Sequence, residues 1–222
     1  MSEDKLVKRL SDLDSCAISD ALDVLNINGV AIGLRQITVQ KKIAGRVVTV
    51  KLVPKTQEQT SNLHLGTAAI EAASNGDVIV VEHFSDKVAG WGGNLAIAAS
   101  LKGISGVIID GACRDVDEMK LIDFPVYARS SVPTTARGRL IEQSFNEKIN
   151  IEGIDVFPND LVLADASGIV FLPCSKAEMI IEEAKKIMEK EERMATAIRS
   201  GLPVSSVMGQ NYETMLQKKL DN

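Results

Sequence analysis

The stretch between Trp91 and Asp115 constrains this chain more than any other, because it sets a glycine turn, a helix, a second turn and a strand in direct succession. The apolar run at 95–102 predicts a short helix, and Val107–Ile109 predicts a β-strand. The charged pair Arg114-Asp115 follows that strand. Helices that alternate with strands in this way indicate an α/β fold.

The same stretch predicts a binding pocket. Glycines let the backbone approach a ligand closely, and the first turn of a helix leaves amide N–H groups unpaired, which favours an anion. If the two ends of the stretch meet, these amides lie beside a guanidinium and a carboxylate. Such a set suits a small carboxylate next to a hard divalent cation. The predicted pocket comprises Gly92, Gly93, Asn94, Leu95, Arg114 and Asp115. The alternative is a glycine turn and a surface ion pair without a ligand.

Composition narrows the functional class. The chain has 222 residues, enough for one core, and its net charge of −5 argues against a general nucleic-acid binder. Three cysteines without CxxC spacing indicate neither a disulfide framework nor a zinc site. The charged start of the chain and the lack of a long apolar run predict a cytoplasmic protein without a membrane partner.

Several enzyme classes lack support in the sequence. Two histidines without a paired partner give little basis for a Ser-His-Asp hydrolase, and we interpret His64 and His83 as structural or solvent-facing. Leu95 stands where a GxGxxG motif needs its third glycine, and no Walker A sequence occurs. Nucleotide binding is therefore not predicted.

The remaining helices and strands are predicted from hydrophobic periodicity and from turn and cap residues. Helices are expected at 3–11, at 15–25 after a cap at Asp14 or Ser15, at 63–73 after a cap at Ser61 or Asn62, and at 116–122. A capping box at Ser175 predicts a long helix that runs to about Arg199. One stripe of this helix carries Met179, Ile180, Ala184 and Ile187. Strands are expected at 43–53, 78–82, 124–128, 154–157, 161–164 and 169–172.

Two segments near the predicted pocket have open interpretations. Asp115 and Glu118 share one helix face if the helix begins at the pair, and either they belong to the site or they are first-turn acids favoured by the helix dipole. The polar loop at 130–135 either closes over the pocket or only connects two elements.

Motifs over most of the chain resemble the RraA-like family, which includes 4-hydroxy-4-methyl-2-oxoglutarate aldolases and regulators of ribonuclease E activity. The match is most specific at Asp110-Gly111-x-x-Arg114-Asp115. It extends to the segments His64-Leu65-Gly66, 76–81, Gly90-Trp91-Gly92-Gly93, 103–109, Phe124-Pro125-Val126 and Pro158-Asn159-Asp160.

The resemblance implies a layered β/β/α swivelling-type domain over residues 1–222, with additional N- and C-terminal helices. The helix and tail from about residue 175 would serve in assembly. It also implies a homotrimer, or a dimer of trimers, whose clefts lie between protomers. An acid from a neighbour's C-terminal helix would approach each cleft, and here it would be Glu189, Glu191 or Glu192.

By the same resemblance, the chain would be a lyase that depends on Mg²⁺ or Mn²⁺ and acts on small 2-oxo acids. It would cleave a 4-hydroxy-2-oxo acid to pyruvate, decarboxylate oxaloacetate, or both. Asp115 would hold the metal, Arg114 the carboxylate or oxo oxygen of the substrate, and the amides of Gly92–Leu95 the carboxylate. Cleavage leaves an enolate that a divalent cation stabilises, and the motif has no lysine for a Schiff base.

One position departs from the family pattern. Active aldolases carry an aspartate, twenty further residues, Arg-Asp, and an acid three places later. Here Glu118 fills the last place, where it would lie beyond the residues that touch the metal, but Gly93 stands at the first. Loss of an acid that orients metal-bound waters lowers activity. The alternatives are therefore a non-catalytic regulator that binds a ribonuclease or another protein, and a pocket that binds a metabolite without turnover.

Overall fold

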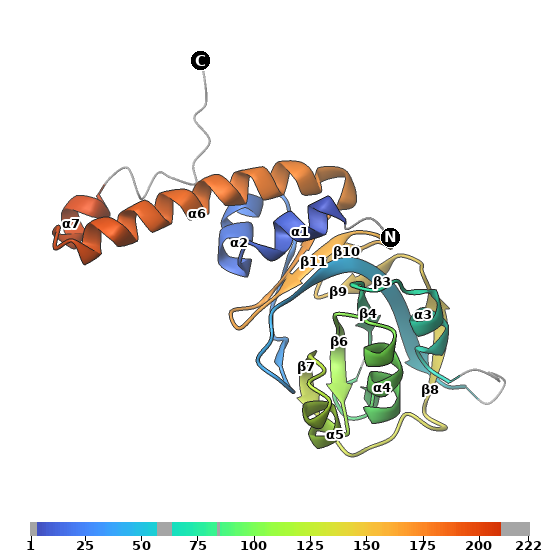
Figure 1. Cartoon of the computed structure of the whole chain (residues 1–222). Coiled ribbons are helices and arrows are strands. Elements are labelled where there is room, and N and C mark those ends of the chain that lie inside the picture. The colour runs from blue at the N-terminus through green and yellow to red at the C-terminus, as the bar shows by residue number, and fades with distance from the viewer. Residues whose placement is uncertain (1–3, 57–63, 84, 210–222) are drawn as a thin grey trace.

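The computed structural model describes residues 4–56, 64–83 and 85–209 and shows a curled sheet flanked by helices (Figure 1). In chain order the elements are α1 (Lys5–Ser11), α2 (Ser15–Val24), β1 (Val30–Ala31), β2 (Arg35–Gln36), β3 (Ile43–Pro54), α3 (Thr67–Ala72), β4 (Val78–Glu82), β5 (Ala89–Trp91), α4 (Gly93–Leu101), β6 (Gly106–Cys113), α5 (Val116–Leu121), β7 (Val126–Ser131), β8 (Leu140–Phe145), β9 (Ile149–Ile151), β10 (Ile154–Val156), β11 (Leu161–Ala164), β12 (Ile169–Leu172), a 3₁₀ turn (Cys174–Lys176), α6 (Ala177–Arg199) and α7 (Val204–Val207).

Strand β3 joins the two parts of the main sheet. Within the described ranges the sheet order is β1-β12-β11-β3-β4-β6-β7-β2, with β5 paired to β6 and β8 paired to β3. The start of β3 runs antiparallel to β11, whereas its middle runs parallel to β4. Strands β4, β6 and β7 continue in parallel, and β9 and β10 form a separate hairpin. The mixed α/β architecture expected from the sequence is thus confirmed.

Alternate residues of the central strands face two different cores. Ile79 and Val81 of β4 pack toward α3 and α4, whereas Val78 and Val80 point into the concave side of the sheet, where the β9–β10 hairpin covers them. Burial on both faces explains why β4 and β6 are continuous apolar runs without a polar alternation. The helical layer of α3, α4 and α5 therefore rests on the parallel part of the sheet, where β5 and β6 end at the same edge.

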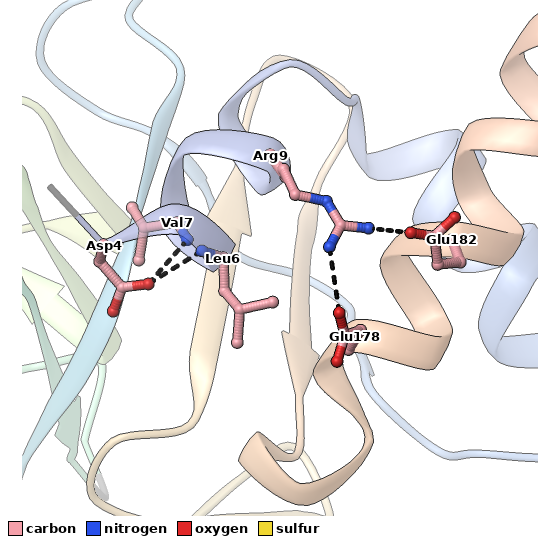
Figure 2. Close-up of polar contacts among 6 residues, drawn as sticks. All are labelled: Asp4, Leu6, Val7, Arg9, Glu178 and Glu182. Atoms are coloured by element: carbon pink, nitrogen blue, oxygen red, sulfur yellow. Dashed lines mark hydrogen bonds and ion pairs between the residues drawn. The ribbon is translucent and has the colours of Figure 1, made fainter.

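A third core joins α1, α2 and α6 to β11 and β12 (Figure 1). Asp4 caps α1 by accepting the N–H groups of Leu6 at 3.0 Å and Val7 at 3.3 Å, and Arg9 reaches Glu178 and Glu182 on α6, as Figure 2 shows. These exposed ion pairs add little stability, so the apolar contacts between the helices hold this layer. None of the helices in the described ranges combines the length and apolarity needed to cross a bilayer.

Several boundaries differ from the sequence-based expectation. Helix α3 begins at Thr67, after Gly66 with φ of +76°, rather than at 63, and the expected caps Ser61 and Asn62 lie outside the described residues. Strand β6 does not end at Ile109 but continues through Cys113, because its second half pairs with β5 and β7. The short strands β1, β2, β5, β8 and β9 were not expected.

The predicted capping box at Ser175 is wrong. Asp160 accepts the N–H of Cys174 at 2.8 Å and Lys176 donates to Pro173, so Ser175 lies inside a 3₁₀ turn, and Lys176 precedes α6 without a side-chain cap. The predicted stripe is correct for Ile180, Ala184 and Ile187, but Met179 is 48% exposed and Ile181 takes its place in the core.

Asp165 ties the β11–β12 turn to the start of α2. Its carboxylate accepts the N–H and the hydroxyl of Ser15 at 2.8 and 2.7 Å, and also the N–H of Ser167 at 2.9 Å. Partial burial raises the pKa of Asp165, but the hydrogen bonds from Ser15, Ser167 and Gly168 outweigh it and leave the pKa lowered. The ionised carboxylate therefore stabilises the folded state at neutral pH.

We expect Asp165→Asn to lower the free energy of unfolding by about 1 kcal/mol at pH 7, because the amide cannot accept all of these bonds and the site is partly solvated. Since the folded-state pKa is lowered, the stabilisation is present above the unfolded pKa and is lost as pH falls through the folded value. Urea unfolding at neutral and acidic pH measures both effects. Glu71→Gln, at an exposed carboxylate on α3, is the control; an equal loss in both variants would contradict the assignment.

Candidate functional site

Two parallel strands bring the ends of the Trp91–Asp115 stretch together. Strand β5 ends at Trp91 and β6 ends at Cys113, and these two residues are partners in the β5–β6 ladder. The backbone N–H of Arg114 donates to the carbonyl of Trp91 at 3.0 Å. Because the carboxyl ends of parallel strands meet at one edge, the glycine turn and the charged pair emerge side by side. The predicted convergence is confirmed.

The Asp115 carboxylate is fixed between the two segments. Its Oδ2 accepts the N–H of Gly93 at 3.0 Å and the Nε–H of Arg114 at 3.1 Å. Asp115 adopts a left-handed conformation, with φ of 57°, and does not cap α5 with its side chain. A non-glycine residue in this region costs about 1–2 kcal/mol, so the surrounding contacts enforce it. The Oδ1 atom has no hydrogen-bond partner among the described residues, and the side chain is 30% exposed.

Unpaired donors lie beside that carboxylate. Helix α4 starts at Gly93, and its first internal bond is the N–H of Ala96 to the carbonyl of Gly92. No described residue accepts the N–H groups of Asn94 or Leu95, and the terminal nitrogens of Arg114 make no ion pair in the described ranges. Together they form a positive site for an anion at the N-terminus of the helix.

A small cleft encloses these groups. Its volume is about 110 Å³, and its walls come from the β5–α4 turn, from Arg114 and Asp115, from His64 and Leu65 before α3, and from Thr135, Ala136 and Arg137 in the loop after β7. Drug-sized ligands need roughly 300–1,000 Å³, so the cleft favours a metabolite with few heavy atoms. The indole N–H of Trp91 in its wall is buried and has no hydrogen-bond partner in the described part of the chain.

Comparison with known proteins identifies the family. A model of the RraA-like family (Aldolase/RraA) matches residues 15–171, well over half of the chain. The chain belongs to the RraA-like family.

The proteins to which this chain is similar carry different functional names. Protein DlpA of Legionella pneumophila is 27% identical over 197 residues, which are 88% of this chain but only 32% of that protein. The 4-hydroxy-4-methyl-2-oxoglutarate aldolase of Thermus thermophilus is 28% identical over 60% of this chain and 76% of its own. The structure of RraAS2 from Streptomyces coelicolor, described as an unusual member of the RNase ES inhibitor RraA family, superposes with a TM-score of 0.77 at 25% identity, covering 86% of this chain and 96% of that one.

The structure shows where the Glu118 side chain lies relative to Gly93. A Cβ atom built on Gly93 would overlap the Oε2 atom of Glu118 and lie 3.3 Å from the Cβ of Asp115. The Glu118 carboxylate therefore lies next to Gly93, but it lines a neighbouring cavity with Arg114 and Asp115 rather than this cleft. The two interpretations left open by the sequence, an acid of the site and a first-turn acid of α5, both stay predictions. Asp117, its neighbour on α5, is exposed, as expected.

Two parts of the cleft wall carried no clear sequence signal: His64 and the loop after β7. His64 forms part of the wall, and the loop after β7 contributes Thr135, although the expected loop start at Ser130 and Ser131 belongs to β7. The loop is held to β5 because Ala89 donates to the carbonyl of Thr134 at 3.0 Å. No sequence signal marked Arg137, since a lone arginine in a polar loop is usually a surface residue.

Neighbouring ionisable groups are unsuited to chemistry. Burial raises the pKa of Cys113 to about 11, so the thiol beside Arg114 stays protonated and is a poor nucleophile. Burial lowers the pKa of His83, although a hydrogen bond to the carbonyl of Val88 opposes the shift, and the ring is neutral at physiological pH. His83 is therefore structural, as the sequence indicated.

The α6 acids stand apart from the cleft of their own chain. Glu189, Glu191 and Glu192 are absent from its walls. Burial raises the pKa of Glu191, and the nearby Asp20 and Asp14 raise it further, which places Glu191 against α2 of the same protomer.

The acidic groups at the cleft fit one mode of binding a divalent cation and not another. No group of three or more His, Cys, Asp or Glu residues in the described ranges could hold a metal. Mg²⁺, however, usually keeps several waters and binds through one or two carboxylates plus substrate oxygens. The open Oδ1 of Asp115, with the Glu118 carboxylate nearby, fits that mode but not a closed protein cage.

Gly66 supports the cleft wall by packing against Trp91. A Cβ at Gly66 would lie 2.9 Å from the Cζ3 atom of Trp91, and Glu142 accepts the Gly66 N–H at 2.6 Å. Burial raises the pKa of Glu142, and this hydrogen bond partly offsets the rise. The segment that carries His64 is thus held directly over the indole ring.

We expect Gly66→Ala to destabilise the protein by about 2–3 kcal/mol, because it adds a contact with the indole to the cost of a left-handed alanine. The emission of Trp91, the single tryptophan, should shift as the ring is displaced. Gly153→Ala is the matched control: its φ is +81°, but nothing lies within 4 Å of the added Cβ. Gly153→Ala should lower stability only by the cost of a left-handed alanine and should leave the Trp91 emission unchanged. Equal spectra in both variants would contradict the packing role.

Proposed function

We propose that this protein is a divalent-metal-dependent lyase that acts on small 2-oxo acids. The observation that carries the proposal is the shared cleft, in which free amides and a guanidinium lie beside a carboxylate with one open oxygen. A carboxylate substrate and a cation each find their preferred partners there. Relatives named as 4-hydroxy-4-methyl-2-oxoglutarate aldolases support the reaction class.

The substrate carboxylate would bind at the start of α4. The N–H groups of Asn94 and Leu95 donate to one side, and the terminal nitrogens of Arg114 donate to the carboxylate or to the 2-oxo oxygen. Arg114 is oriented for this role because its Nε is already bonded to Asp115. The glycines at 92 and 93 keep side chains out of the space that the substrate needs.

Mg²⁺ or Mn²⁺ would be held by Oδ1 of Asp115, with water and substrate oxygens completing the shell. When bound, the cation supplies a Lewis acid that draws electron density toward the 2-oxo group. The chain fixes the carboxylate for this purpose, since Gly93 and Arg114 occupy Oδ2 and leave Oδ1 exposed.

Both candidate reactions break a carbon–carbon bond β to the ketone. In retro-aldol cleavage the C4 hydroxyl loses its proton, the C3–C4 bond breaks, and C3 gains a proton to give pyruvate and a second carbonyl compound. In decarboxylation of oxaloacetate, CO₂ leaves and C3 is protonated in the same way. No lysine lines the cleft in the described ranges, so a Schiff-base route has no nucleophile there.

Assembly is part of the proposal. The distal half of α6 projects with α7 away from the sheets (Figure 1), and Leu202 and Val204 there are each 54% exposed. We infer that this arm packs against other copies in a homotrimer or a dimer of trimers, where its exposed apolar side chains would be removed from water. Glu189 and Glu192, which pair with Lys185 and Arg199 on the same arm, would then approach a neighbour's cleft.

We expect Mg²⁺-dependent pyruvate release from a 4-hydroxy-2-oxo acid or from oxaloacetate, abolished by EDTA. Asp115→Asn should lower kcat/KM by more than about 100-fold, because it removes the metal ligand, while asparagine still tolerates the left-handed backbone. A lactate dehydrogenase-coupled assay measures pyruvate. Asp117→Asn, an exposed carboxylate two residues away, should retain wild-type rates.

The competing candidate is a non-catalytic regulator of a ribonuclease, favoured by the glycine at position 93 and by the relation to an RNase ES inhibitor family. No turnover with any 2-oxo acid, together with inhibition of a purified ribonuclease E-type enzyme, would replace the lyase by the regulator. Binding of pyruvate without turnover and without such inhibition would instead indicate a metabolite-binding protein.

A further inference from the structure

The cleft continues into a second cavity, which we call the distal chamber. Its volume is about 140 Å³, so it is at least as large as the cleft of about 110 Å³. The two cavities share four wall residues, which are His64, Leu65, Ala136 and Arg137. The rest of the described wall of the distal chamber consists of Lys55, Gly138, Leu140 and Ile141. The space therefore extends from the cleft toward the end of β3 and the start of β8.

Backbone hydrogen bonds fix the walls of the distal chamber. The end of β3 pairs with the start of β8, and the ladder continues with the N–H of Lys55, which donates to the carbonyl of Arg139 at 2.8 Å. The N–H groups of Arg139 and Leu140 both donate to the carbonyl of Ala136, at 2.8 and 3.0 Å, and close a tight turn. The shape of the chamber therefore depends on a strand pair and a turn, not on the ends of exposed side chains.

The distal chamber combines an apolar floor with a cationic rim. Leu65, Leu140 and Ile141 are buried, whereas Lys55 and Arg137 are exposed. Neither the amine of Lys55 nor the guanidinium of Arg137 makes a hydrogen bond or ion pair with any described residue. Apolar walls with a few polar groups that fix orientation are typical of small-molecule sites. Such a wall suits a short hydrocarbon segment that ends in an anion.

The acid that follows Ile141 in the sequence does not neutralise this rim. Glu142 accepts the N–H of Gly66 at 2.6 Å and is not a wall residue of the chamber. Among the described residues, the wall contains no aspartate or glutamate. The distal chamber is therefore electropositive, although the chain as a whole has a net charge of −5.

We propose that the distal chamber binds the C4 substituent of the substrate, and that this substituent is a short hydrocarbon chain with a terminal carboxylate. The inference rests on the proposed lyase function and names its substrate class, a 4-hydroxy-2-oxo diacid with an extended chain. Lys55 lines the chamber but not the cleft, and Leu65 and Ala136 lie at the junction of the two. A carboxylate that reaches Lys55 must therefore be separated from C4 by methylene groups.

This substrate differs from the one named for the aldolase relative. In 4-hydroxy-4-methyl-2-oxoglutarate the second carboxylate is bonded directly to C4. In this chain such a carboxylate would lie at the apolar junction, where burial of a charge is unfavourable. Cleavage of the C3–C4 bond, with loss of the C4 hydroxyl proton and protonation of C3, would give pyruvate and a carbonyl compound that carries the distal carboxylate.

Isothermal titration calorimetry with a ladder of 2-oxo acids in the presence of Mg²⁺ tests the proposal without turnover. The ladder consists of pyruvate, 2-oxoglutarate, 2-oxoadipate, 2-oxopimelate and 2-oxoheptanoate, the last of which matches 2-oxopimelate in chain length but lacks its second carboxylate. We expect 2-oxoadipate or 2-oxopimelate to bind at least about 10-fold more tightly than pyruvate, because charged hydrogen bonds form at the rim. The affinity for 2-oxoheptanoate should stay below that for 2-oxopimelate.

A charge-removing variant locates the contact. Lys55→Gln should weaken binding of 2-oxopimelate about 10-fold more than binding of pyruvate, because only the longer acid reaches the distal chamber. Lys120→Gln is the matched control, since this exposed lysine of α5 lies outside both cavities, and it should bind every acid like the wild type. Thermal unfolding checks that both variants are folded.

The outcomes separate the chamber from the function on which it rests. If the wild type binds none of the 2-oxo acids, both the lyase site and the distal chamber are rejected. If pyruvate binds but the longer diacids bind no more tightly, only the chamber assignment is rejected and the lyase proposal stands. Equal affinities for 2-oxoheptanoate and 2-oxopimelate, or an equal loss for both acids in Lys55→Gln, reject the chamber in the same way.

Discussion

The hydrogen bond from Gly93 N–H to Asp115 Oδ2 is the interaction on which the site depends. It joins two segments that lie 22 residues apart, and it is possible only because β5 and β6 end at the same edge of the sheet. It also accounts for the left-handed backbone of Asp115, which turns the carboxylate back toward the turn instead of over the first turn of α5. Without that bond, Asp115 would be an ordinary helix cap and the cleft would lose its fixed anion.

The buried sheet explains why the hydrogen bond between Gly93 and Asp115 has a fixed geometry. The strands that carry the site are buried on both faces, one face against α3 and α4 and the other in the concave core. A turn between such strands and the helices has little freedom, so the donors and the carboxylate are organised before any ligand arrives. Preorganisation of this kind is what catalysis by charge stabilisation needs. The loop after β7, tied to β5 through Ala89, closes the remaining side.

The sequence predicted short apolar strands between turn residues best. Strands β4, β11 and β12 match their expected ranges, and the glycine turn and Arg114-Asp115 meet as expected. The strand β5 was missed because three residues, Ala-Gly-Trp, carry no alternation, although this strand sets the geometry of the site. His64 and Arg137 were missed as cleft residues because their position depends on loops that pack across the sheet. The placement of Glu118 needed coordinates, since helical spacing put it near Asp115 but could not show that Gly93 leaves space for it.

The pairing of β1 with β12 has a consequence for synthesis of the chain. Val30 is the ladder partner of Val170, so the edge strand near the N-terminus has no neighbour until almost the whole family-matched region has left the ribosome. The apolar faces of α2 and β3 emerge early and must wait for β11, β12 and α6. Contacts between residues far apart in the sequence form slowly, and apolar surface stays exposed until they form. A premature stop before residue 161 would therefore leave the apolar faces of α2 and β3 without the elements that cover them.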